Sequence, residues 1–136
     1  MSFILDEFCS LDGRRYLVQD VKFSDNGDTF TLRYRRTDAS AKADRKRRVN
    51  LDTLVVFPLD KVDVYVTEYR LPRGEDRFSL RVRTRGRLTT IQVNRHNFRG
   101  SVSLVWGIRN EGKLRALAKA FHHLTAVVAG RKELFQ

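Results

Sequence analysis

The chain has 136 residues, of which 41% are hydrophobic and 32% charged, and its formal net charge is +11. This length suits one domain, residues 1–136, that folds without metals or disulfides. The sequence has no apolar run near the roughly 20 residues of a membrane span, and its start, MSFILDEFCSL, lacks the basic region of a signal peptide. A single cysteine, Cys9, excludes an internal disulfide. We therefore expect a cytoplasmic protein, or a nuclear one if the source is eukaryotic.

The positive charge is concentrated in the second half of the sequence. Residues 1–63 contain 12 Lys and Arg against 11 Asp and Glu, a net of +1, whereas residues 64–136 contain 15 against 5, a net of +10. Arginine supplies 20 of the 27 basic residues, and its guanidinium group binds phosphate in a bidentate way. Charge of one sign gathered in one half of a chain indicates an anionic partner.

The first predicted element is a β-hairpin. Residues 14–23 and 29–35 are typical of strands, and SDNG at 24–27 is typical of the turn between them. The second strand alternates Phe30, Leu32 and Tyr34 with polar side chains, which places Arg33 and Arg35 on the outer face. Residues 2–9 fit either a short helix or an edge strand.

A basic loop and two further strands follow. Residues 36–48, RTDASAKADRKRR, contain no large apolar side chain, so we predict a mobile loop. Its end carries Arg45, Arg47 and Arg48, which are typical of a phosphate clamp or a nuclear-import signal. Residues 51–59 predict a buried strand that ends near Pro58. Alternating valines predict another strand over residues 62–70.

Residues 77–88, RFSLRVRTRGRL, place an arginine at almost every second position. We predict a hairpin of residues 77–83 with 88–94, closed at Arg85-Gly86. Phe78, Leu80 and Val82 would then pack with Val93, Ile91 and Thr89. The other face would carry Arg77, Arg81 and Arg83, with Arg85 and Arg87 at the tip. Neighbouring like charges on one face cost stability, so this face favours an external anion over a plain solvated surface.

The remaining elements are a loop, a strand and a helix. Residues 95–100 predict a loop in which Arg95 and Arg99 accompany His96 and Phe98, rings that either stack on an unpaired base or, for Phe98, anchor the loop in the core. Residues 101–108 predict the last strand. Asn110 is a good N-cap, and an apolar stripe at helical spacing runs toward Gly130, the expected stop. Residues 131–136 are expected to fray.

About seven strands followed by one amphipathic helix predict an α+β fold, a strongly bent antiparallel sheet or small barrel closed by the helix. This order resembles the pleckstrin-homology-like barrel. The last four strands with the helix also resemble the ββββα unit of Whirly- and PC4-type single-strand binders. Both resemblances rest on element order and imply that the helix packs on a bent sheet.

Catalytic motifs are missing from the sequence. It has no GxSxG, P-loop or GxGxxG pattern, and His122 and His123 point about 100° apart on a helix, which does not suit one metal ion. We therefore predict a non-enzymatic protein without cofactor or metal; a nuclease with His96 as base is a distant alternative.

The leading hypothesis is a module that binds nucleic acid, RNA or single strands rather than duplex DNA. Strand-borne aromatic and polar side chains would contact exposed bases while arginines follow the backbone. One alternative is a pleckstrin-homology-like module that binds an acidic protein or anionic lipid head groups. Another is a structural or assembly protein that uses the basic face as a subunit interface. The sequence leaves the oligomeric state open.

Overall fold

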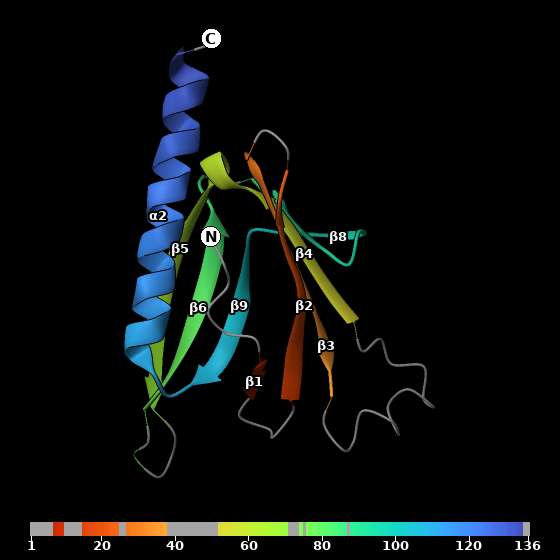
Figure 1. Cartoon of the computed structure of the whole chain (residues 1–136), viewed down its shortest axis with the longest axis vertical. Coiled ribbons are helices and arrows are strands. Elements are labelled where there is room, and N and C mark those ends of the chain that lie inside the picture. Colours follow the sequence, from red (N-terminus) through yellow and green to blue (C-terminus); the bar gives the residue numbers. More distant parts are fainter. Residues whose placement is uncertain are drawn as a thin grey trace.

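Two antiparallel sheets and one C-terminal helix make up the described part of the protein (Figure 1). The computed structural model describes residues 7–9, 15–24, 27–37, 52–70, 74, 76–86 and 88–134. The larger sheet has the strand order β1-β2-β3-β4-β7-β8 and contains β1 (Glu7–Cys9), β2 (Arg15–Phe23), β3 (Thr29–Arg36), β4 (Asp52–Pro58), β7 (Ile91–Val93) and β8 (Asn97–Arg99). The smaller sheet has the order β5-β6-β9 and contains β5 (Val62–Arg70), β6 (Asp76–Thr84) and β9 (Ser101–Ile108). The α+β class is confirmed, but the described strands do not form a closed barrel.

The first hairpin is confirmed. β2 pairs with β3 from Tyr16 opposite Arg36 to Phe23 opposite Phe30, with one irregularity between Val18 and Asp20. Phe30, Leu32 and Tyr34 of β3 are buried, as their alternation predicts. Of the ambiguous residues 2–9, those described form β1 at the edge of the larger sheet, paired with β2.

The core lies where the two sheets and the helix meet. After Pro58 a single 3₁₀ turn, η1 (Leu59–Lys61), carries the chain from the larger sheet into the smaller one. The ring of Phe30 in β3 lies 5.1 Å from Phe57 in β4 and 5.0 Å from Phe121 in the helix, measured between centroids. Tyr16 and Tyr34 pack against Trp106 of β9 at 5.0 and 5.9 Å. These aromatic contacts join the two sheets.

The C-terminal helix, α2 (Glu111–Leu134), packs against β5, β6 and η1 (Figure 1). Asn110 is its N-cap, since its side-chain oxygen accepts a hydrogen bond from the Lys113 amide at 3.1 Å. The predicted apolar stripe is buried at Leu114, Leu117, Ala118, Phe121, Thr125 and Val128. The predicted stop at Gly130 is wrong, because the helix continues to Leu134; one glycine costs a helix only about 1 kcal/mol.

The predicted hairpin of residues 77–83 with 88–94 is wrong. β6 pairs with β5 over its whole length, from Thr84 opposite Val62 to Asp76 opposite Arg70, and with β9 on its other side. β5 offers alternating valines opposite Leu80 and Val82 over nine residues, a longer apolar ladder than the predicted partner would give. Residues 88–90 form no strand, and the three residues of β7 pair instead with β4 and β8.

Two other expectations are wrong in part. The last strands do not form one ββββ unit, because β7 lies in the larger sheet while β5, β6 and β9 form the smaller one; the Whirly/PC4-like resemblance is therefore wrong. The loop predicted at residues 36–48 begins too early, since Arg36 ends β3 and is 7% exposed. Residues 38–50, with Arg45, Arg47 and Arg48, lie outside the described residues, as does Arg87.

Candidate functional site

The arginines of β6 and its tip largely have partners within the protein. Asp63 of β5 lies opposite Arg83 and approaches it at 4.0 Å, and the same carboxylate accepts a hydrogen bond from Arg85 at 2.9 Å. The Arg83 guanidinium also lies 5.0 Å from the centre of the Tyr65 ring. Arg77 donates to the backbone oxygen of Asp76 at 3.2 Å. The predicted repulsion on this face is relieved at Arg83 and Arg85, because the true partner strand supplies Asp63.

The outer face of the larger sheet carries a different set of side chains. Cross-strand partners point to the same side of a sheet, so the register groups these side chains in rows. One row contains Arg35 opposite Leu17 and Asp52, and the next contains Arg33 opposite Asp20 and Leu54. A third row contains Lys22, Thr31, Val56, Gln92 and Phe98. The face thus combines basic, polar and apolar groups over neighbouring strands.

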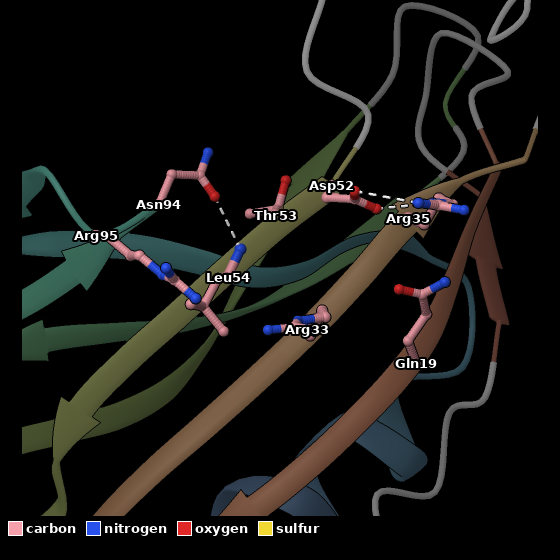
Figure 2. A pocket seen from close by; sticks show the side chains of 8 residues that line it. All are labelled: Gln19, Arg33, Arg35, Asp52, Thr53, Leu54, Asn94 and Arg95. Carbon is pink, nitrogen blue, oxygen red and sulfur yellow. Dashed lines mark hydrogen bonds and ion pairs between the residues drawn. The ribbon is translucent and has the colours of Figure 1, made fainter.

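A hollow of about 380 Å³, here called the outer hollow, lies on this face. Figure 2 shows the eight residues that line it, including Arg33, Arg35, Arg95 and Asn94. Arg35 binds Asp52 through two hydrogen bonds, of 2.7 and 3.2 Å, and these raise the pKa of Arg35. By contrast, Arg33 and Arg95 form no hydrogen bond or ion pair through their side chains with any residue in the described part of the chain. Within the described ranges, the guanidinium groups of Arg33 and Arg95 therefore have no carboxylate bound to them.

Asn94 fixes the turn that places Arg95 in the outer hollow. Its amide N–H donates to the Leu54 carbonyl at 2.8 Å, and its side-chain oxygen accepts a hydrogen bond from the Leu54 amide at 2.9 Å. Asn94 and Arg95 have φ values of 51° and 67°, a left-handed conformation that asparagine tolerates well. The side chain of Gln92 then closes the turn with a 2.6 Å hydrogen bond to the Arg95 carbonyl.

The turn leads into β8, the edge strand of the larger sheet, where a loop was predicted. Phe98 in β8 is 60% exposed, so it does not anchor the segment in the core. Because Phe98 lies opposite Gln92, its ring occupies the outer face with Arg33 and Arg95. His96 and Arg99 are also exposed. An exposed aromatic ring on a sheet face that also carries guanidinium groups is typical of a base-stacking surface.

A second hollow, of about 570 Å³ and here called the inner hollow, contains Arg81 and Arg99. It shares Thr53 and Asn94 with the outer hollow. Arg81 donates to the hydroxyl of Ser103 at 2.7 Å. The structure thus divides the predicted arginines. Arg33, Arg35 and Arg95 meet in the outer hollow, Arg81 and Arg99 meet in the inner one, and Arg77, Arg83 and Arg85 line neither.

Sequence reasoning missed the residues that organise the site. Asn94 and Asp52 have no distinctive motif around them, and their role depends on the pairing of β4 with β3 and β7. One local signal was present, since asparagine is a residue that commonly adopts a left-handed turn. That signal would have indicated a tight turn at residues 94–96 and hence a strand at Phe98.

Other kinds of site find no support in the described residues. No group of three or more His, Cys, Asp or Glu within them could hold a metal ion. The only α-helix there, α2, lacks the length of apolar sequence that crossing a bilayer requires.

No known protein family, curated protein or solved structure matches the chain.

Proposed function

We propose that the protein is a non-enzymatic module that binds single-stranded nucleic acid, with RNA favoured, on the outer face of its larger sheet. The proposal rests on the exposure of Phe98, a residue that is 60% exposed on a β-sheet face that also carries Arg33 and Arg95. An exposed ring stacks on an unpaired base, and free guanidinium groups bind the phosphates beside it. The formal net charge of +11 adds long-range attraction.

The spacing of the basic groups supports a strand that runs across the sheet. Arg33 lies on β3 and Arg95 follows β7, with only β4 between these strands. Neighbouring strands are about 4.8 Å apart, so the two backbone positions are separated by roughly 10 Å. Leu54 and Val56 of β4, half-buried and on the same face, provide an apolar floor between the basic groups.

We favour single strands over duplex DNA because α2 packs on the smaller sheet and is not available to enter a groove of the duplex. The apolar side of α2 is buried against β5, β6 and η1, and no other helix longer than the single turn η1 is described. Recognition by a sheet face needs bases that are already unstacked, which single-stranded RNA or DNA supplies.

A pleckstrin-homology-like order of elements remains part of the proposal and rests on the sequence of strands and helix alone. A module of that kind would bind anionic lipid head groups or an acidic protein through the same arginines. An assembly protein would instead bury the basic face against another copy of the chain. Nucleic acid is preferred because stacking on a base uses the exposed ring of Phe98 together with the nearby arginines.

The test is a fluorescence-anisotropy titration with labelled single-stranded RNA, single-stranded DNA and duplex DNA. We expect both single strands to bind more tightly than the duplex. Three neutralised phosphates on a single strand give a slope of log affinity against log salt of about −2, or a loss of roughly 15-fold between about 50 and 200 mM salt. No binding to any of the three at low salt would reject the proposal, and binding to anionic vesicles alone would favour the lipid alternative.

The ring of Phe98 gives the test its specificity. Phe98→Ala should weaken single-strand binding by about 1–3 kcal/mol, the usual value of one base–aromatic stack, without changing the salt slope. Phe98→Leu keeps apolar bulk without the aromatic face and should lose nearly as much. Val127→Ala is the control, because Val127 is also exposed but lies on α2. Equal affinity of the Phe98→Ala variant and the native protein would contradict the stacking role.

A further inference from the structure

The inner hollow combines donors from both sheets and lacks acidic groups. Among the residues that line it are Arg81, Ser79, Ser101 and Ser103 of the smaller sheet, and Arg99 and Asn94 of the larger sheet and its turn. None of its lining residues is aspartate or glutamate. Two guanidinium groups without a carboxylate in the same hollow give it a positive potential that suits an anion.

Arg81 is held in place and still has free donors. Its two terminal nitrogens donate to Ser103 at 2.7 Å and to Ser101 at 3.5 Å. A guanidinium group has five N–H donors, so donors remain for a ligand while the serine hydroxyls fix the orientation of the group. Arg99, which comes from the larger sheet, is exposed and forms no hydrogen bond or ion pair through its side chain within the described ranges.

Ser79 adds another hydroxyl to the inner hollow. Its side chain lines the inner hollow and the residue is only 5% exposed. Its hydroxyl forms no hydrogen bond with any other residue that the structure describes. This hydroxyl is not among the enclosed side-chain oxygens of the described residues that lack a partner, so it is open to the hollow and can donate to a ligand there.

The aromatic part of the wall does not oppose a negative charge. Trp106 and Tyr34 line the hollow with their rings 5.9 Å apart. Burial raises the pKa of Tyr34 to about 12, partly offset by its hydrogen bond with Thr53. Tyr34 is therefore neutral at physiological pH and adds a polar hydroxyl.

We propose that the inner hollow binds a phosphate monoester. A monoester carries a charge of about −1.5 to −2 at pH 7 and three acceptor oxygens, which matches two guanidinium groups and nearby hydroxyls better than the single charge of a backbone phosphate does. The source is either a free nucleotide or, building on the proposed function, the terminal phosphate of the bound strand. Asn94 and Thr53 line both hollows, so a strand on the outer face could end in the inner one.

The first experiment tests the hollow without an oligonucleotide. Trp106 is the single tryptophan of the chain and lines the inner hollow, so intrinsic fluorescence reports directly on occupancy. Adenosine monophosphate should change this fluorescence saturably, whereas adenosine should not. Arg99→Gln and Ser79→Ala should each weaken the response, Arg99→Gln by roughly tenfold through loss of a charge-assisted contact. Arg95→Gln is the matched control, since Arg95 lines only the outer hollow.

The second experiment compares one single-stranded RNA with a 5′-phosphate, a 3′-phosphate or hydroxyls at both ends. We expect one phosphorylated form to bind roughly tenfold more tightly than the hydroxyl form, and Arg99→Gln to remove that difference. Equal binding of all three RNAs, with no response to adenosine monophosphate, would overturn the monoester site and leave the proposed function intact. A response to adenosine monophosphate without binding of any RNA would keep the site, with free nucleotide as the source, and reject the proposed function.

Discussion

The two arginine-bearing regions of the molecule look alike in sequence and differ in structure. On the smaller sheet, Arg83 and Arg85 share the carboxylate of Asp63, and Arg83 also lies over the Tyr65 ring. On the outer face of the larger sheet, Arg33 and Arg95 have no such partner among the residues described. The regular alternation of arginines along β6 is therefore less informative than the scattered arginines of β3 and the β7–β8 turn.

The difference shows that a basic strand must be judged together with the strand beside it. Arg83 is compensated because β5 places Asp63 opposite it, 20 residues earlier in the chain. Arg33 has Asp20 as a register neighbour, but that carboxylate pairs with Lys22 at 3.2 Å. Charge that the fold neutralises contributes little to binding, whereas charge left without a partner is available to an external anion.

The largest expected effect in this comparison comes from Asn94, which builds the outer hollow without carrying charge. Asn94→Ala removes the acceptor for the Leu54 amide and replaces asparagine, which tolerates the positive φ, with alanine, which does not, so we expect a loss of about 2 kcal/mol in the free energy of unfolding. Single-strand affinity should also fall, because Arg95 loses its position although every arginine remains. Chemical denaturation and anisotropy measure the two effects.

Asn94→Gly is the control for backbone strain. Glycine accepts the positive φ but cannot bind the Leu54 amide, so its loss of stability should be about half that of the alanine variant. Equal stability of the native protein and both variants would show that the turn does not depend on Asn94.

A smaller effect is expected from Asp63, whose removal should make the two regions more alike. Asp63→Asn releases Arg83 and Arg85 and should cost at most about 1 kcal/mol, as for other exposed ion pairs. The steepness of the salt dependence should rise modestly, because additional guanidinium groups become available to phosphate. A large loss of stability in thermal denaturation, or a weaker salt dependence, would contradict the proposed role of Asp63 as a compensating charge.

Local patterns in the sequence predicted the elements well. Alternation identified β3, β5 and β9, and capping with helical spacing identified α2 from its N-cap at Asn110. Pairing between distant strands was harder to predict. The apolar residues of β6 are compatible with either neighbour, and nine residues of contact with β5 outcompete the three residues of β7.

The candidate site was predictable only in part for the same reason. Arg33, Arg35 and Arg95 were predicted as surface groups, and Phe98 as either a stacking ring or a core anchor, but their common face results from β7 pairing with β4. The inner hollow depends on Arg99 and Arg81 approaching from different sheets. Serines 79, 101 and 103 have no pattern of their own, and only the tertiary structure gathers them.

The most direct test of the difference between the two regions compares two double variants that lose the same charge. Arg33→Gln with Arg95→Gln removes free groups, and Arg83→Gln with Arg85→Gln removes groups that Asp63 already compensates. In single-stranded RNA titrations the first variant should lose roughly 10–100-fold in affinity and reduce the salt slope by about 1.4, while the second should change affinity by less than about twofold. Equal losses in both variants would show that net charge alone governs binding and would contradict an interface on the larger sheet.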